Sequence, residues 1–327
     1  MAEQHWREEL GRKAEQSGFS DVRIAAAGLP VQYGERLNQW LALGLHGEMA
    51  YMQKTAAMRV QGAESVLPGA RSVIVFLAPY FSRPESRQME SRSGKVAKYA
   101  LGRDYHIVFR ERLQPIADWL ANTHPNNQWR IVTDSAPLNE RAFAVESGIG
   151  FYGKNTMVIS PRRGSFFLLA EVVTTAALPA DAPVTGTCGT CTRCITACPT
   201  GALDTPFQID ATKCISYLTI EKKSPMTADE HEAAGDWLFG CDICQDICPY
   251  NKHPEETRIQ DFENGVRMEA DQPLDAILQL ESNSRFEKHF AESPLLRPGR
   301  RRVVARATYI AEHAEPTITP TEVSKDL

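Results

Sequence analysis

The eight cysteines of this chain constrain its fold and its chemistry more than any other feature. All of them lie between Cys188 and Cys248, and the 187 residues before them contain none. Four follow one another with the spacing Cys188-x2-Cys191-x2-Cys194-x3-Cys198. This spacing is typical of chains that hold two [4Fe–4S] clusters, in which three cysteines of a run bind one cluster and the fourth binds the other.

A second run, Cys241-x2-Cys244-x3-Cys248, completes the pattern of a bacterial two-cluster ferredoxin except for one upstream cysteine. Cys214 is the only cysteine left to supply it. We therefore predict two sets of four ligands, one set for each cluster. The first set is Cys188, Cys191, Cys194 and Cys248, and the second set is Cys198, Cys214, Cys241 and Cys244.

Zinc binding and disulfide bonds are the alternative uses of such cysteines. Structural zinc sites usually present two separated cysteine pairs, which the triplet Cys188–Cys194 does not match. Disulfides need an oxidising compartment, and the N-terminus Met1–His5 lacks the pattern of a signal peptide. No apolar run approaches the roughly 18 residues of a membrane span. We therefore expect a cytoplasmic protein that does not enter a membrane.

The length and charge of the chain limit its organisation. Its 327 residues predict about two domains, at ~150 residues per domain. The formal net charge of −5 means that any nucleic-acid-binding surface has to be a local basic patch. The stretch Pro179–Pro183 is typical of a linker, and it divides a cysteine-free domain over residues 1–180 from a two-cluster, ferredoxin-like domain over 181–255.

Helix-like and strand-like patterns alternate in the cysteine-free part, which predicts a layered domain of the α/β or α+β class. Strands are expected at Phe19–Ala27, Ser72–Pro79 and Trp129–Thr133, with a hairpin formed by Met157–Ser160 and Phe166–Thr174. Helices are expected at Gln32–Gly44, Glu48–Met58, Tyr105–Thr123 and Leu138–Ser147. Residues 256–316 are expected to form a helical segment, and residues 317–327 a disordered tail.

Two glycine-rich patterns are similar to nucleotide-binding motifs, but neither has all the features that such a motif requires. Gly148-x-Gly150-x2-Gly153 satisfies the dinucleotide fingerprint, but a helical pattern precedes it and a strand pattern follows, which reverses the required context. The same stretch is a near miss to the P-loop, because Asn155 stands where Ser or Thr binds magnesium. We interpret it as a turn.

Six segments, in order, resemble the epoxyqueuosine reductase family and together extend over nearly the whole chain. They are Leu67–Ile74, Tyr99–His106, Thr133–Ala142, Gly153–Thr156, Cys214–Lys223 and Gly240–Pro249. The resemblance implies an oxidoreductase that uses cobalamin to remove the epoxide oxygen of epoxyqueuosine at the wobble position of tRNA. It also implies that the first domain binds cobalamin and is similar to corrinoid-dependent reductive dehalogenases. Clusters of this kind reach potentials of about −400 mV or below, as the reduction of cobalamin requires.

The same resemblance assigns a proton donor. In the family this role belongs to an aspartate of the Asp-Ser/Thr-x-Pro region, which here is Asp134, at the end of the strand predicted over Trp129–Thr133. Opening an epoxide leaves an alkoxide, so a general acid is needed beside it. The ordinary alternative is a turn or helix-capping aspartate ahead of Pro137.

Cobalamin contacts are expected from polar and aromatic side chains in the family-like segments. They are Arg59, Tyr99, Tyr105, His106, Lys154 and Asn155. Asp104-x-His106 is similar to the D-x-H-x2-G signature of corrinoid proteins, but Phe109 occupies the glycine position, so His106 need not be the lower ligand of cobalt. Solvation of the cations and packing of the tyrosines are the alternatives.

A tRNA substrate requires local positive charge. Two basic stretches meet this requirement, although a solvated basic face is the commoner meaning of a charge run. They are Lys222 and Lys223, and the arginines Arg297, Arg300, Arg301, Arg302 and Arg306. We expect a monomer that takes electrons from an external low-potential reductant. A corrinoid-dependent reductive dehalogenase and a non-catalytic electron carrier are the competing functions.

Overall fold

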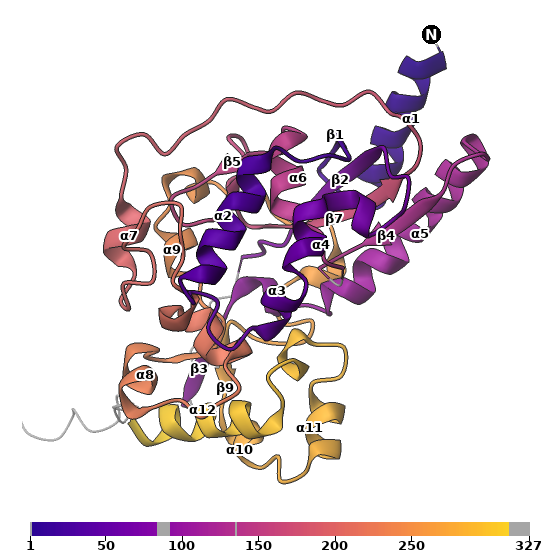
Figure 1. Cartoon of the computed structure of the whole chain (residues 1–327). Helices are drawn as coiled ribbons and strands as arrows, with labels where there is room; N and C mark the ends of the chain where they lie inside the picture. Colours follow the sequence, from indigo (N-terminus) through magenta and orange to yellow (C-terminus); the bar gives the residue numbers. More distant parts are fainter. Residues whose placement is uncertain (1, 84–91, 135, 314–327) are drawn as a thin grey trace, which may run out of the picture.

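The computed structural model describes residues 2–83, 92–134 and 136–313, and Figure 1 shows its elements. A four-stranded sheet in the order β1-β2-β7-β4 forms the centre of the first part of the chain. Each neighbouring pair of strands in it is antiparallel. The strands are β1 (Asp21–Ala26), β2 (Ser72–Pro79), β7 (Phe167–Thr174) and β4 (Trp129–Val132).

Helices cover both faces of this sheet, and all residues of β2 are consequently buried. The covering helices are α1 (Ala2–Gln16) and α5 (Tyr105–Thr123) on one face and α6 (Glu140–Glu146) on the other. Ile74 of β2 shares a core with Phe109 of α5, whereas its neighbour Val73 shares a core with Phe143 of α6. Successive side chains of a strand point to opposite faces, so one apolar strand supplies two cores.

Three short helices connect β1 to β2. They are α2 (Val31–Ala42), α3 (Ala50–Lys54) and α4 (Ala56–Gln61). The single helix predicted over Glu48–Met58 is wrong, because the helix is interrupted at Thr55. The Thr55 hydroxyl donates a hydrogen bond to the Tyr51 carbonyl (2.8 Å), an arrangement that bends helices.

The hairpin predicted from Met157–Ser160 and Phe166–Thr174 does not form. Strand β6 (Val158–Ile159) pairs with β5 (Phe151–Tyr152), whereas β7 lies between β2 and β4. Side chains from both faces of β7 enter the two cores, so β7 is a central strand. The strand predicted at Ser72–Pro79 and the helix predicted at Tyr105–Thr123 are confirmed.

A second, three-stranded sheet combines strands from all three predicted parts of the chain. Strand β3 (Ser93–Val96) lies between β8 (Trp237–Phe239) and β9 (Asp271–Pro273). Boundaries at residues 180 and 255 therefore divide segments that share a sheet. The C-terminal helices pack beside this sheet, as the yellow part of Figure 1 shows. They are α10 (Asp275–Leu278), α11 (Asn283–His289) and α12 (Arg300–His313).

The cysteine-bearing segment contains little regular structure. Its helices are α7 (Arg193–Ala197), α8 (Ala228–Ala233) and α9 (Ile243–Asp246), and α7 packs against α9. The predicted tail over 317–327 lies outside the described residues. Within the described residues, no helix combines the length and the apolar character that crossing a bilayer requires.

Gly102 is a point of close backbone contact between the first part of the chain and the segment after the cysteines. A Cβ atom there would lie 2.1 Å from the Asp261 carbonyl oxygen and 2.6 Å from the Cα atom of Phe262. Because both are backbone atoms, we expect Gly102→Ala to push the segments apart and to lower the free energy of unfolding by roughly 1–3 kcal/mol. Gly28→Ala, which meets no atom within 4 Å, is the matched control. Calorimetric melting curves that coincide for both variants would contradict this packing.

Candidate active site and cluster sites

The first predicted cysteine set surrounds one small cavity. Cys188, Cys191, Cys194 and Cys248 line a volume of about 40 Å³. Three of these residues come from α7 and the loop before it, and Cys248 follows α9. Burial, and then the neighbouring Cys188 and Cys248 thiols, raises the pKa of the Cys194 thiol. Four sulfurs around one cavity fit the donor set of a cubane cluster.

The second set includes Cys244, which lies within α9. Burial, together with the charges of Cys214, Asp242 and Cys198, raises the pKa of the Cys241 thiol to about 12. Burial and the neighbouring Cys241 and Cys214 raise the pKa of Cys244 well above its usual range, and Cys194 of the first set adds to this effect. The two sets are therefore adjacent. All eight cysteines are free thiols, and thiolate sulfur is the donor that such clusters require.

Two residues predicted to contact cobalamin, Lys154 and Asn155, lie at the cysteine loops. The Lys154 ammonium donates hydrogen bonds to the carbonyls of Gly189 (2.8 Å) and Cys191 (3.0 Å). The Asn155 amide is buried and donates to the Cys244 carbonyl (3.2 Å). These polar groups are engaged with backbone around the cluster sites, and corrin contacts of Lys154 and Asn155 stay a prediction.

Asp134 follows β4, and its side chain is 59% exposed. Tyr105, at the start of α5, donates a hydrogen bond from Oη to Oδ2 of Asp134 (2.8 Å). The Nε2 atom of His106 lies 4.0 Å from the same oxygen, and its Nδ1 atom lies 2.7 Å from Oδ1 of Asp104. Burial, and then the charge of Asp134, raises the pKa of Tyr105 well above its usual range, so the phenol keeps its proton and remains a donor.

The backbone at Asp134 is in the left-handed region, with φ of +48°. A non-glycine residue in this conformation costs of order 1 kcal/mol and persists where neighbours hold it. The Asp134 backbone N–H donates to Oε1 of Glu140 (2.5 Å), and the Arg59 guanidinium donates to the Leu138 carbonyl (2.9 Å). Arg59, predicted to contact cobalamin, therefore holds the loop that follows Asp134.

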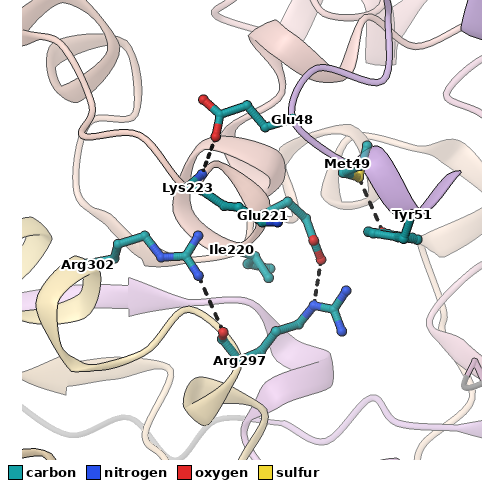
Figure 2. A pocket seen from close by; sticks show the side chains of 8 residues that line it. All are labelled: Glu48, Met49, Tyr51, Ile220, Glu221, Lys223, Arg297 and Arg302. Atoms are coloured by element: carbon teal, nitrogen blue, oxygen red, sulfur yellow. Dashed lines mark hydrogen bonds and ion pairs between the residues drawn. The ribbon is translucent and has the colours of Figure 1, made fainter. Parts of the chain in front are cut away.

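Figure 2 shows a second feature of the structure, a cavity of about 280 Å³. It is lined by Glu48, Met49, Tyr51, Ile220, Glu221, Lys223, Arg297 and Arg302. The Arg297 Nε atom lies 2.6 Å from the Glu221 carboxylate, and the Arg297 guanidinium lies 6.0 Å from the Tyr51 ring centre. Burial raises the pKa of Tyr51, and the charges of Glu221, Arg297 and Asp134 also act on it, so Asp134 is near the cavity.

One predicted tRNA contact is ruled out by its burial. Arg306 is 2% exposed, and its guanidinium donates to the carbonyls of Trp237 (2.9 Å), His231 (2.9 Å) and Gly235. Burial lowers the pKa of Arg306 to about 10. The prediction is wrong for Arg306, because its donors face backbone in the interior, where a phosphate cannot reach.

The other basic residues differ in how freely they face solvent. Lys222 forms an ion pair with Glu230 (2.5 Å), and Arg302 donates to the Pro298 carbonyl (2.6 Å). Arg300 donates to the Leu280 carbonyl (3.1 Å). Lys223, Arg297 and Arg301 are exposed, and Arg297 is also paired with Glu221. These three side chains are the predicted tRNA contacts with the most accessible charge.

Sequence reasoning missed three residues of the site, namely Tyr51, Glu140 and Glu171. Glu171 is 0% exposed and is the only charged residue of strand β7. A single carboxylate in a buried strand is expensive to ionise, and this isolated charge is the signal that could have identified it. Tyr51 and Glu140 carry no such signal, because exposed or helix-starting residues of these types are common.

Comparisons with known proteins identify the family. The sequence model described as the 4Fe-4S double cluster binding domain matches residues 187–251, and the one described as epoxyqueuosine reductase QueG matches residues 61–135. An epoxyqueuosine reductase of Synechococcus sp. (strain RCC307) is 41% identical over 251 residues, which are 75% of each chain.

Solved structures agree with the sequence relatives. One relative is an epoxyqueuosine reductase from Bacillus subtilis, whose structure has the aspartate-bearing catalytic loop swung out of the active site. It superposes on this chain with a TM-score of 0.85 and is 31% identical in sequence, and the match covers 94% of this chain and 82% of that chain. A structure of epoxyqueuosine reductase with an epoxyqueuosine-modified tRNA stem loop has the same TM-score and identity, over 94% and 81%. The chain is thus an oxidoreductase with a double [4Fe–4S] cluster domain. It belongs to the epoxyqueuosine reductase family.

Paired cysteine substitutions test which ligands share a cluster. Cys191→Ala with Cys248→Ala should remove one cluster and leave about half of the roughly eight irons, because both residues line the same cavity. Cys191→Ala with Cys241→Ala should remove both clusters. The measurement is iron and acid-labile sulfide per chain after anaerobic reconstitution, with electron paramagnetic resonance of the reduced protein. Equal iron loss in the two double variants would contradict the assignment.

Proposed function

We propose that this chain reduces epoxyqueuosine to queuosine at the wobble position of tRNA, with cobalamin supplied with electrons by the two [4Fe–4S] clusters. Membership of the family supports the reaction, and the structure with a modified tRNA stem loop concerns a relative that is alike over 94% of this chain. The observation that carries the proposal is that Asp134 accepts a hydrogen bond from Tyr105 and is close enough to Tyr51, which lines the 280 Å³ cavity, for its charge to act on the Tyr51 phenol.

Cobalamin would be held by the group of residues around Asp134. The rings of Tyr99 and Tyr105 lie 6.3 Å apart, and the Tyr105 and His106 rings are stacked at 4.2 Å. Together with the half-exposed Asp134, they provide aromatic surface and polar groups of the kind that a corrin ring with an amide rim requires. When bound, cobalamin would supply the nucleophilic chemistry that opens the epoxide.

Asp134 would protonate the alkoxide that epoxide opening leaves. The Tyr105 hydroxyl fixes Oδ2 of Asp134 from one side, and Glu140 fixes the Asp134 backbone from the other. The proton donor is therefore held by two elements, α5 and α6, although it lies on a loop. Such support matters because general acid catalysis depends on the distance between the donor and the reacting atom.

The basic residues around the cavity would bind the tRNA backbone. Lys223 and Arg297 line the cavity itself, and Arg301 is exposed on α12 beside it. Phosphate contacts of this kind position a nucleic acid without reading its sequence. A flipped-out wobble nucleoside could then enter the cavity, as bases do in enzymes that act on them.

We also propose a compartment, an electron source and an oligomeric state for the enzyme. Its substrate is a tRNA, so we place the protein in the cytoplasm. The clusters need electrons from an external low-potential donor, because the reaction consumes two for each turnover. We propose that one chain acts alone, since the cysteine sets and Asp134 all belong to the same chain.

The experiment that tests this function is mass analysis of tRNA nucleosides from cells that lack the gene. We expect epoxyqueuosine to accumulate and queuosine to disappear, with restoration by the intact gene. If queuosine levels are unchanged and no epoxyqueuosine is found, the proposal is wrong. Release of halide from halogenated aromatic compounds by the purified enzyme would favour a reductive dehalogenase.

Replacing Asp134 by Asn should abolish proton donation and preserve the loop, because Asn also tolerates the left-handed conformation. We expect kcat to fall by about 100-fold or more, while both clusters remain reducible by dithionite. The measurement is single-turnover formation of queuosine by the reconstituted enzyme. Wild-type turnover in the Asp134→Asn variant would contradict the role of Asp134.

Two arginines of α12 give a matched test of the basic surface. Arg301→Ala should weaken tRNA binding several-fold and leave the melting temperature unchanged, because its side chain is exposed. Arg306→Ala should lower stability by roughly 3 kcal/mol or more, because it leaves buried carbonyls without donors. Filter binding at several salt concentrations and thermal melting measure the two effects. A loss of stability in Arg301→Ala, or a loss of tRNA binding without a loss of stability in Arg306→Ala, would contradict the assignment of Arg301 to the surface and Arg306 to the interior.

A further inference from the structure

The proposed reaction needs more protons than Asp134 holds, and the following inference rests on that proposed function. Converting an epoxide to an alkene breaks two C–O bonds and releases the oxygen as water, so each turnover consumes two electrons and two protons. The electrons come from an external one-electron donor by way of the clusters. The first proton neutralises the alkoxide of the opened ring, and the second leaves with the oxygen. A single carboxyl group supplies one of them.

Glu171 is a buried acid close to this site. It is 0% exposed, and among the described residues neither of its carboxyl oxygens has a hydrogen-bond partner of ordinary geometry. Its strand position places it on the face of β7 that carries Val173, which packs with Phe143 of α6. Burial, and then the charges of Glu140 and Asp134, raises the pKa of Glu171 well above its usual range. Burial without a cationic partner in the part of the chain that the structure describes therefore favours the neutral carboxylic acid form of Glu171.

Glu140 connects this buried acid to the proton donor. It begins α6, and its Oε1 accepts the backbone N–H of Asp134 at 2.5 Å. Burial, and then the charge of Asp134, raises the pKa of Glu140 to about 8. The cations that face Glu140, Arg59 from α4 and Arg141 from α6, act in the opposite direction. Glu140 is consequently also protonated at neutral pH and can release its proton in the physiological range.

We propose that Glu140, supported by Glu171, is a proton reserve that reprotonates Asp134 between the two proton transfers of one turnover. The carboxylic acid of Glu140 gives its proton to the Asp134 carboxylate, which leaves the charge on Glu140. The neutral Glu171 then shares its proton with the Glu140 carboxylate and stabilises that charge. Solvent restores the proton of Glu140 after product release. Neither glutamate touches the substrate, so both are positioning and relay residues.

The groups that face Asp134 from α5 do not fill this role. Tyr105 donates a hydrogen bond to Asp134, but its raised pKa makes it a poor proton source. His106 is engaged with Asp104 through Nδ1 at 2.7 Å, and its Nε2 lies 4.0 Å from Asp134. Hydrogen bonds from His106 lower the pKa of Asp104 even though burial opposes them, so Asp104 is ionised at neutral pH. We therefore assign the second proton to the carboxyl pair, which Glu140 links to Asp134 through its hydrogen bond with the Asp134 backbone N–H.

The test uses the reconstituted holoenzyme and its pH profile. Glu140→Gln keeps an oxygen acceptor for the Asp134 N–H but has no proton to give. Glu146→Gln is the control, because it alters a carboxylate of the same helix that binds Tyr33 instead (2.8 Å). We expect the wild type and Glu146→Gln to lose kcat about tenfold per pH unit above pH 8. Glu140→Gln should have kcat lowered roughly 10- to 100-fold at pH 7, no such decline near pH 8, and a KM for tRNA within about twofold of wild type.

A second measurement does not depend on activity. Infrared spectra of the holoenzyme without tRNA should contain a carboxylic acid C=O band at pH 7 that is absent in Glu171→Gln, and a second band that disappears near pH 8 and is absent in Glu140→Gln. Wild-type kcat and pH profile in Glu140→Gln, or spectra without these bands, would overturn the proton reserve. A wild-type holoenzyme that forms no queuosine would instead overturn the proposed function and this inference with it.

Discussion

Backbone pairing of β3 with β8 and β9 is the constraint on which the rest of the structure depends. Strand β3 comes from the first part of the chain, β8 from the cysteine-bearing segment and β9 from the C-terminal part. This sheet fixes the cysteine segment against the α/β layers, and it does so through hydrogen bonds that loops alone could not supply. Electron entry and the Asp134 site are consequently parts of one folded unit.

Contacts between these segments also stabilise buried ionisable side chains. Asp242 is buried, and the Lys98 backbone N–H donates to its carboxylate (2.7 Å), while Lys98 itself belongs to the segment after β3. Burial raises the pKa of Asp242 to about 6, against the opposing charge of Lys98. In the described part of the chain no ion pair joins a cation to the carboxyl groups of Glu140 and Glu171, and burial raises the pKa of both. Near the clusters a cation opposes the effect of burial on a carboxyl group, whereas near Asp134 burial favours the protonated forms of the two glutamates.

The positive φ of Asp134 has a related meaning. A strained residue persists only when its neighbours determine its conformation, and here Glu140 holds the backbone while Tyr105 holds the carboxylate. The Asp134 carboxylate is nonetheless more than half exposed. An exposed acid on a held loop can meet a large substrate without losing its orientation, which a nucleoside still attached to tRNA requires.

The sequence was informative where one local pattern decides the structure. Cysteine spacing predicted one set of four that lines a common cavity. The apolar strand Ser72–Pro79 and the helix Tyr105–Thr123 were predictable from periodicity alone. The pairing of the strands was not predictable in this way, because the order β1-β2-β7-β4 depends on contacts between segments far apart in the chain. Arg306 illustrates the same limit: its spacing fits a basic surface, but the packing of α12 against β8 buries it. Lys154 and Asn155 lie in a family-like segment, yet only the fold reveals that they contact the cysteine loops.

The central claim is that the two clusters deliver electrons to one reduction on a tRNA nucleoside. The most direct measurement is the stoichiometry of an anaerobic reaction between the reconstituted holoenzyme, a one-electron reductant and tRNA that contains epoxyqueuosine. Mass spectrometry of the digested nucleosides gives the product, and the absorbance of the reductant gives the electrons. The account predicts two electrons consumed for each queuosine formed, with the loss of one oxygen atom from the nucleoside. Electrons consumed while epoxyqueuosine remains intact would contradict it.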